Sequence, residues 1–574
     1  ERFLRYALAG RRPWTFFFGT AGLMVVAFVL LGAFPPKVEF FPSNEPQYLN
    51  IFITKPIGTD IEETNRVTCE IEELVLEVMN EERFQRPNPE TGEMEAYIAN
   101  SIIGQVGNGT SDPQEGPSLG NTPHKARIAV NFVKFQERRG QSSRDVLRSV
   151  RERLSGYPDA EIIVTKNSDG PPQGPPINIE IRGDDYDDVL LTANSMRQFL
   201  RELDFEGVEE LKIDVDKRKP ELPITIDREK ARRYGLSTQN IGYTIRTALF
   251  GREVSTFKDG EDDYPINVRF EESSRNNVDA LMNQKVIFRS ASDGQIKEVP
   301  ISAVATADRS TTFSSVKRKD LDRVITLSSN VLEGANANEI VLQMQESLKG
   351  FNAPGGVSFA FTGQQEEQAK ELAFLSQALL VALFLIILII VAQFNSITTP
   401  FIIGFSVFFS LIGVLLGLVI FQMDFVIIMT MIGIISLAGV VVNNAIVLID
   451  YTDLIRERKR RELGSESHLP FAEVEESIVQ GGRTRLRPVL LTAITTILGL
   501  LPLAIGLNID FVTLVTEYDP RIYIGGDNNV FWKPMSWAII YGLTFATFLT
   551  LIIVPVMYWW INRMLYKYRL KEAV

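Results

Sequence analysis

Cysteine and histidine are almost absent from this sequence of 574 residues. The single cysteine, Cys69, cannot form an intrachain disulfide, so no disulfide framework holds the chain together. The two histidines, His124 and His468, lie far apart and have no cysteine or histidine neighbour at a ligand-like spacing. We therefore expect no metal site and no bound cofactor.

Catalytic and nucleotide-binding motifs are also missing. The sequence has no Ser/His/Asp set, no nucleophile elbow, no Walker loop and no cluster of metal ligands. Acidic residues outnumber basic ones, 71 to 59, and no basic stripe with interleaved aromatics is present, which argues against a nucleic-acid partner. The sequence thus predicts a protein that is not an enzyme. Any active transport would draw its energy from an ion gradient or from a partner.

Long apolar runs are abundant in place of these motifs. A helix that spans a lipid bilayer needs roughly 20 mainly apolar residues. Six segments qualify, at about 14–34, 372–394, 397–420, 425–450, 486–508 and 535–561. The first follows Arg11 and Arg12 as a secretory signal would, but its apolar part is too long and no convincing cleavage site follows. Six retained spans are therefore predicted.

Lysine and arginine set the direction of these spans. They gather in four stretches: 1–12, RERKRR (456–461), Arg483 to Arg487, and the tail from Arg563. When the spans are counted in order, all four stretches fall on one side, which the positive-inside rule makes cytoplasmic. We expect both termini in the cytoplasm, with residues 35–371 and 509–533 on the outer side.

Two adjacent asparagines interrupt the fourth apolar run, in GVVVNNAIVLIDY (439–451). Each amide of Asn443 and Asn444 needs a hydrogen-bond partner, because leaving it unpaired in an apolar setting costs roughly 1–3 kcal/mol. Polar groups at this depth either mark an ion pathway or only hold helices together. Both interpretations stay open from the residues alone.

Glycines punctuate the membrane region in two places. Gly413 and Gly417 form a GxxxG pair that would let another helix approach closely. Between the fourth and fifth spans, LPFAEVEESIVQGG (469–482) has the pattern of a short amphipathic helix that ends at its two glycines. Its apolar residues are expected to lie along the inner membrane surface; they are Phe471, Val474 and Ile478.

The region between the first two spans alternates strand and helix patterns. Strands are expected at 47–55, 125–134 and 160–165, with helices at 60–79 and 143–154. After GPPQGPP (170–176) come strand 177–182, helix 188–203, strand 207–214, strand 322–329, helix 336–349 and strand 357–362. This order predicts two small α+β units of split βαβ (ferredoxin-like) type. An insertion at about 223–318 interrupts the second unit.

The insertion begins with clear helix boundaries. Asp227 is suited to begin a helix, Gly235 to end it, and Ser237 or Thr238 to begin the next. In the first unit, the loop at 104–124 is long, polar and rich in glycine, including Gly104, Gly107 and Gly109. Such loops in compact domains tend to be functional or disordered. We interpret this one as part of a substrate path.

Several of these stretches together resemble one known family. GVVVNNAIVLIDY, followed by RTRLRPVLLTAITTILGLLPLA (483–504), is similar to the C-terminal half of resistance–nodulation–division (RND) exporters. IDREKARRYGLSTQNI in the insertion and FTGQQEEQ (361–368) resemble that half too. The order of parts also matches, with one span, a large outer region and then five spans.

The resemblance implies a division of the chain into named parts. They are an N-terminal segment with the first span (1–34), a first porter subdomain (35–172), a second porter subdomain (173–222 and 319–363), a docking subdomain (223–318) and a five-helix bundle with a cytoplasmic amphipathic helix (364–574). RND exporters work as proton-driven trimers of twelve-span chains in the bacterial inner membrane. Many pair with a periplasmic adaptor and an outer-membrane channel. An N-terminal half, in the same or a separate chain, would then complete this one.

The resemblance also suggests a proton relay, with one departure. The position that matches Asn443 is a lysine in many members, where it pairs with two aspartates of the N-terminal half. A neutral amide cannot neutralise a carboxylate, so the relay must balance charge differently here. Asn444, Arg485 and Thr492 match family positions linked to the proton pathway.

The main hypothesis is therefore one half of a proton-driven exporter of hydrophobic or amphiphilic compounds. A non-transporting receptor or scaffold, with outer domains that bind a ligand or partner, is the alternative that the asparagine keeps open. A metal-ion exporter would need methionines along a path, for which only Met423, Met429 and Met431 gather in or beside the fourth span. Methionine is more often an adaptable packing residue. A membrane enzyme has no catalytic set to support it.

Overall fold

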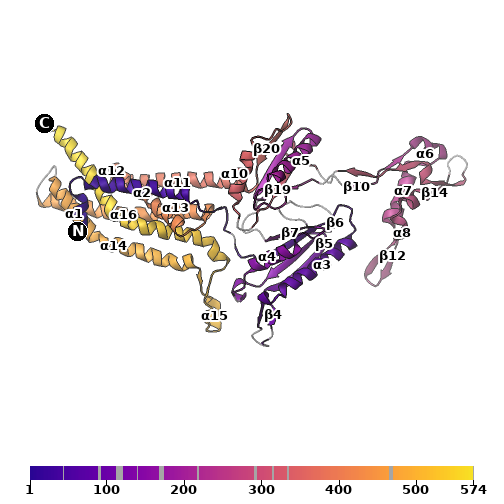
Figure 1. Ribbon diagram of the computed structural model, residues 1–574, viewed down its shortest axis with the longest axis horizontal. Helices are drawn as coiled ribbons and strands as arrows, with labels where there is room; N and C mark the ends of the chain where they lie inside the picture. The colour runs from indigo at the N-terminus through magenta and orange to yellow at the C-terminus, as the bar shows by residue number, and fades with distance from the viewer. Residues whose placement is uncertain are drawn as a thin grey trace. The chain divides into compact units, whose positions relative to one another are not determined.

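The computed structural model describes residues 1–42, 44–87, 92, 94–110, 121–138, 140–166, 174–215, 219–289, 294–312, 316–332, 335–463 and 469–572 (Figure 1). His468 and residues 111–120 of the predicted loop at 104–124 lie outside these residues. The chain divides into two compact units. One comprises Glu1–Lys55, Asp60–Asp214 and Lys319–Val574, and the other comprises Pro56–Thr59 and Val215–Arg318.

Within the described residues, six helices are long and apolar enough to span a membrane, as predicted. They are α2 (Arg12–Ala33), α11 (Gln364–Phe394), α12 (Thr398–Ile420), α13 (Ile427–Glu462), α14 (Phe471–Ile505) and α16 (Asp527–Glu572). Short helices α1 (Arg2–Leu8) and α15 (Phe511–Thr516) accompany them. The six long helices and α1 share one large apolar core, to which α12, α13 and α16 contribute most of the buried residues.

The predicted amphipathic helix at 469–482 is wrong as a separate element. It forms the first part of α14, which continues without interruption through Gly481 and Gly482. A Cβ at Gly481 would lie 2.5 Å from Thr452 Oγ1, and one at Gly482 would lie 2.5 Å from Leu4 Cδ1. The glycines therefore serve close helix packing and do not end the helix. Val474 and Ile478 are buried in the bundle core. The prediction that they lie along the membrane surface is therefore wrong.

The GxxxG pair does bring another helix close, as predicted. A Cβ at Gly413 would lie 2.6 Å from the backbone oxygen of Tyr541 in α16. A Cβ at Gly417 would lie 2.3 Å from the ring of the same tyrosine. Because side-chain rotation cannot relieve a clash with backbone, the contact between α12 and α16 depends on glycine at 413.

Replacement of Gly413 by alanine should destabilise the bundle by about 1–3 kcal/mol, the usual cost of overpacking. Gly404 lies on the same helix, and a Cβ there would meet nothing within 4 Å. Gly404→Ala is therefore the matched control, and it should stabilise slightly because alanine favours helix by up to about 1 kcal/mol. Thermal unfolding of the purified protein in detergent measures both. Equal midpoints for the two variants would contradict the packing argument.

Sheet I is antiparallel, with strand order β5-β6-β2-β7. Its strands are β2 (Tyr48–Thr54), β5 (Ala99–Gly107), β6 (Thr122–Phe132) and β7 (Glu161–Lys166). Helices α3 (Ile61–Met79) and α4 (Ser143–Leu154) pack on it in one apolar core. The predicted strands and helices of this region correspond to these elements, except that β5 was not predicted. Gly104 and Gly107 therefore belong to a strand, and not to a loop.

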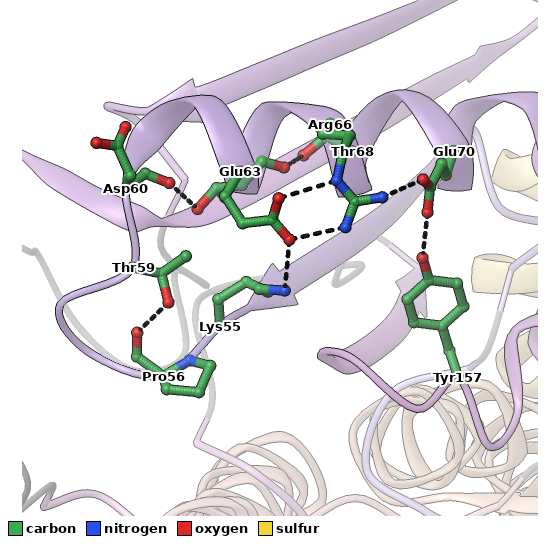
Figure 2. A network of polar contacts seen from close by, with 10 residues as sticks. Lys55, Pro56, Thr59, Asp60, Glu63, Arg66, Thr68, Glu70 and Tyr157 are labelled. Atoms are coloured by element: carbon green, nitrogen blue, oxygen red, sulfur yellow. Dashed lines mark hydrogen bonds and ion pairs between the residues drawn. The ribbon is translucent and has the colours of Figure 1, made fainter.

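A chain of polar contacts runs along the exposed side of α3 (Figure 2). Arg66 pairs with Glu63 at 2.7 Å and with Glu70, and the Tyr157 hydroxyl donates to Glu70 at 2.7 Å. Lys55, buried at the end of β2, reaches Glu63 at 3.4 Å. The hydrogen bond from Arg66 lowers the pKa of Glu63 to about 2. Burial, with help from Glu70, raises the pKa of Tyr157 to about 12. The contacts tie α3 to β2 and to the turn after α4.

Sheet II has the strand order β18-β19-β8-β20, and β9 also pairs with β19. Its strands are β8 (Ile177–Gly183), β9 (Lys212–Ile213), β18 (Lys317–Lys319), β19 (Asp322–Ser329) and β20 (Val357–Phe361). Helices α5 (Tyr186–Glu202) and α10 (Ala337–Leu348) contribute buried apolar side chains to the same region. The predicted strand at 207–214 is mostly irregular, because Gly207 adopts a φ of 87° and only Lys212 and Ile213 pair as a named strand.

The second unit, formed by Pro56–Thr59 and Val215–Arg318, contains small helices and two-stranded pairs. They include α6 (Arg228–Tyr234), α7 (Thr238–Phe250), α8 (Glu272–Arg275), α9 (Val278–Met282), the hairpin β12 (Arg252–Asp259) with β13 (Asp262–Val268), and β14 (Lys285–Arg289) with β15 (Ile296–Pro300). The predicted helix boundaries are confirmed. Asp227 accepts from the amides of Glu229 and Lys230, Gly235 ends α6 at a φ of 82°, and Ser237 accepts from the amide of Asn240.

Candidate functional site

Two of the four relay residues predicted in the membrane region, Asn444 and Thr492, meet where α13 packs beside α14. Asn444 is only 6% exposed, and its side-chain oxygen lies 3.1 Å from the hydroxyl of Thr492. That hydroxyl also lies 3.0 Å from the backbone oxygen of Val489, so its one proton serves two acceptors. The Thr492–Asn444 hydrogen bond therefore links two helices at the edge of the bundle, with Asn444 buried and Thr492 on the exposed side of α14.

The other two predicted relay residues lie elsewhere. Asn443 points to the exposed side of α13, so consecutive asparagines face different surroundings. Arg485 lies seven residues before Thr492 in α14, and its guanidinium stacks 4.3 Å from the centre of the Tyr451 ring. Among the described residues, the Nε of Arg485 is buried without a hydrogen-bond partner. The structure thus brings Asn444 and Thr492 together and leaves Asn443 and Arg485 outside that contact.

One polar cluster in the bundle was not predicted. Asp453 of α13 accepts a hydrogen bond from the hydroxyl of Tyr558 in α16 and pairs with Arg456 at 3.3 Å. Tyr558 is 5% exposed, whereas the side chains of Asp453 and Arg456 are 42% and 29% exposed, so only the tyrosine is enclosed by the bundle. The spacing of Asp453 and Arg456 is visible in the sequence as an ordinary helical pair. Only the fold brings Tyr558 from 105 residues away.

The three glycines of the predicted substrate path lie in or just after β5. A Cβ at Gly104 would lie 3.7 Å from a carboxylate oxygen of Glu72, and one at Gly107 would lie 2.9 Å from Ile61 Cδ1. Gly107 and Gly109 adopt φ angles of 81° and 67°, which favour glycine. Backbone conformation and packing therefore account for these glycines, and a role in a substrate path stays a proposal.

Ligands for a metal ion are sparse in the part of the chain that the structure describes. No group of three or more histidine, cysteine, aspartate or glutamate side chains gathers there. Of the three methionines considered as metal ligands, Met423 accepts a hydrogen bond from the Tyr541 hydroxyl at 3.3 Å, and Met429 is 5% exposed. Both contribute to packing between helices.

Two ion pairs connect the sheet I region to the sheet II region. Arg151 of α4 lies 3.5 Å from Glu209, and Glu161 of β7 pairs with Lys212 of β9. Beside Glu209, a groove of about 410 Å³ is lined by the end of α5, the segment from Asp204 to Leu211, and Met344 of α10. Contacts of this polar kind are typical of domains that move relative to one another.

A sequence profile of the AcrB/AcrD/AcrF family matches residues 1–562, nearly the whole chain. This chain belongs to the AcrB/AcrD/AcrF family. The finding confirms the resemblance to RND efflux transporters.

Curated relatives of this family member differ in the cargo that their names state. The cobalt-zinc-cadmium resistance protein of Cupriavidus metallidurans is 28% identical over 67% of this chain and 33% of that protein. The multidrug resistance protein MdtC of Klebsiella pneumoniae is 24% identical over 75% of this chain and 39% of that protein. The chain thus spans 33% to 39% of the length of these two relatives.

A solved structure supports the same fold. The crystal structure of a heavy metal efflux pump superimposes with a TM-score of 0.73 at 21% identity. The match covers 98% of this chain and 52% of that pump chain. The arrangement of six apolar helices with α+β units is therefore an RND transporter fold.

Proposed function

We propose that this chain forms one half of a proton-driven exporter that moves hydrophobic or amphiphilic compounds out of a bacterial cell. The observation that carries the proposal is the Thr492–Asn444 hydrogen bond between α13 and α14. Polar groups held between membrane helices commonly mark an ion pathway. Membership in the AcrB/AcrD/AcrF family supports a function in efflux.

The uncovered side of α14 supports the existence of a second half. Only 17% of its most apolar stretch is buried, against 61% for α16. Thr492 and Thr495 of α14, and Asn443 of α13, are exposed in this chain. Polar side chains are unfavourable against lipid, so we expect helices of an N-terminal half, in the same or a separate chain, to cover them.

In the proposed mechanism, Asn444 and Thr492 respond to protonation of carboxylates in an N-terminal half. Asn443, being neutral, would offer hydrogen bonds to these carboxylates and leave their charge to other groups. Arg485 provides a fixed positive charge two helical turns from Thr492. The helix shifts that follow protonation would open and close a cleft between the sheet I and sheet II regions. The ion pairs Arg151–Glu209 and Glu161–Lys212 fit such a polar, separable contact.

The proposed assembly follows the subdomains of the family. The sheet I and sheet II regions would be split-βαβ porter subdomains (35–172, and 173–222 with 319–363), and 223–318 would be the docking subdomain. We expect a homotrimer in the inner membrane with both termini in the cytoplasm, where the basic stretches lie. A periplasmic adaptor and an outer-membrane channel would complete the export route.

Metal-ion export is a second candidate, favoured by the names of the Cupriavidus relative and of the heavy metal efflux pump. To separate the two, the complete transporter should be tested for export of Nile red and for cellular accumulation of Co²⁺ and Zn²⁺, with the proton gradient intact or collapsed. We expect gradient-dependent export of Nile red and unchanged ion accumulation. Lowered ion accumulation without dye export would favour metal cargo. Neither effect would favour a receptor or scaffold.

We also propose that the segment predicted as a loop at 104–124 gates the substrate cleft; its residues 111–120 lie outside the described part of the chain. Removal of residues 111–120, with the glycines of β5 kept, should change which dyes are exported while expression stays the same. Export of Nile red and of two dyes of different charge gives the profile. An unchanged profile would rule the gating role out.

A further inference from the structure

One side chain joins three separate segments where the sheet II region meets the membrane helices. Asn338, in the first turn of α10, donates from Nδ2 to the backbone oxygen of Val38 at 3.0 Å. Its Oδ1 accepts from Nε2 of Gln365, at the start of α11, at 2.9 Å. The orientation of the amide follows from chemistry, because the oxygen of Val38 can only accept. Both functional atoms of Asn338 are therefore used.

Val38 is itself tied to the start of α13. Strand β1 (Val38–Glu39) pairs in parallel with β21 (Phe425–Val426), with Val38 opposite Phe425. The amide of Phe425 donates to the oxygen of Lys37 at 2.8 Å. Phe40, Leu375 and Ile427 form a small buried core beside this pair. Since β21 leads directly into α13, the segment after the first span and the beginning of α13 form one packed piece.

That piece lies at one end of the helix that carries Asn444. Ile427 begins α13, and Asn444 follows 17 residues later, about 26 Å along a helix that rises 1.5 Å per residue. A hydrogen-bonded helix moves largely as a rigid element. A shift at Asn444 would therefore displace β21, then β1, and through Val38 it would reach Asn338.

The covalent connection between sheet II and the bundle is less constrained. Strand β20 leads through Thr362 and Gly363 into α11. Gly363 has a φ of 65°, and only 11% of the most apolar stretch of α11 is buried. Leu375 of α11 packs beside Ile427 at the start of α13, but most of the rest of α11 is uncovered in this chain, so the hydrogen bond to Val38 is the more direct link between α13 and α10.

We propose that Asn338 is a positioning residue that couples displacement of α13 to displacement of α10. The proposal rests on the proposed function, in which α13 responds to the proton gradient. It adds the residue that would transmit the movement of α13 from the membrane helices to α10. Loss of the hydrogen bond to Val38 should leave α13 and α10 folded. Displacement of α13 should then no longer displace α10.

The substitution Asn338→Asp tests this link selectively. Aspartate keeps the acceptor for Gln365 and removes the donor to Val38. Asn194→Asp is the matched control, because Asn194 lies in α5 and donates to Leu190 of its own helix at 2.9 Å. Both substitutions introduce the same charge into the same region.

The readout is the rate at which a fluorescent maleimide modifies Leu342→Cys, with Cys69 replaced by serine. Leu342 is 65% exposed on α10. The complete transporter is placed in proteoliposomes with or without an imposed proton gradient. The parent is the protein with Leu342→Cys and Cys69→Ser only. A coupling free energy of ordinary size predicts that the gradient changes the labelling rate at least about fivefold in this parent and in Asn194→Asp. In Asn338→Asp the change should fall below about twofold, at an unchanged unfolding temperature.

Two results would overturn the coupling role: an equal response in Asn338→Asp and the parent, or a parent without any response. Export of Nile red from the same proteoliposomes tests the proposed function separately. If labelling of Leu342→Cys responds to the gradient but Nile red is not exported, the proposed cargo is wrong. The coupling role of Asn338 would still stand.

A disulfide between Val38→Cys and Phe425→Cys provides a second test that does not depend on how Asn338→Asp folds. Because these residues are direct partners in the β1–β21 pair, the disulfide should leave the gradient response within about twofold of the reduced form. Loss of the response on oxidation, with recovery on reduction, would mean that the strands separate during the cycle. That result would overturn the proposed route.

Discussion

Replacement of Thr492 by valine should reduce gradient-driven export by about tenfold or more. Valine has nearly the shape of threonine but cannot donate to Asn444, whose oxygen lies 3.1 Å from the hydroxyl. An unsatisfied buried acceptor costs about 1–3 kcal/mol, and each 1.4 kcal/mol corresponds to about tenfold in an equilibrium. The measurement is the initial rate of Nile red export by the complete transporter, at matched expression.

Thr495→Val is the matched control for this prediction. Thr495 lies one turn further along α14, and its hydroxyl bonds only to backbone oxygens of its own helix, those of Leu491 and Thr492. This variant should retain most of the export rate. Equal losses in the two variants would assign the effect to helix packing, and no loss in Thr492→Val would remove Thr492 from the relay.

Replacement of Arg138 by methionine should destabilise the sheet I region by about 3–5 kcal/mol, the typical cost of breaking a buried charge pair. Arg138 is 2% exposed and donates to the backbone oxygens of Val133 and Pro46 at 3.0 Å each. Its guanidinium also lies 3.7 Å from a carboxylate oxygen of Glu45. Methionine fills similar space but leaves these acceptors without the donor.

Hydrogen exchange of the β2 and α4 amides in the detergent-solubilised protein measures this loss. A loss of this size should accelerate exchange by more than about a hundredfold. Arg144→Met is the control, since the Arg144 side chain is 36% exposed, against 2% for Arg138, and lies 3.9 Å from the same carboxylate. An exposed pair contributes less than about 1 kcal/mol. Similar exchange in both variants would contradict the role of Arg138.

The six spans and the helix boundaries at Asp227, Gly235 and Ser237 were predictable because their signals are local. A long apolar run has few alternatives to a membrane helix, and a side-chain cap needs only residues three or four positions away. Strand β5 was missed because its sequence, ANSIIGQVG, lacks strict alternation. Pairing with β6 stabilises it, and that partner is chosen by the tertiary fold.

The candidate site was predictable in part. The sequence put polar residues in two consecutive membrane helices, and their spacing in each helix was visible. It could not decide which asparagine would meet Thr492, because that depends on how α13 is rotated about its axis. The structure turns Asn444 toward Thr492 and Asn443 away from it.

The sequence by itself determined the number of spans, the order of the parts and the family, because apolar length and short motifs do not depend on distant contacts. The tertiary structure decided that α14 continues through Gly481–Gly482 and that Gly413 packs against α16. It also decided which backbone oxygens accept hydrogen bonds from Arg138. It also placed Asn338 against Val38, which lies 300 residues earlier in the chain. Such contacts form only when the fold closes, because no local pattern specifies which distant backbone group a side chain will meet.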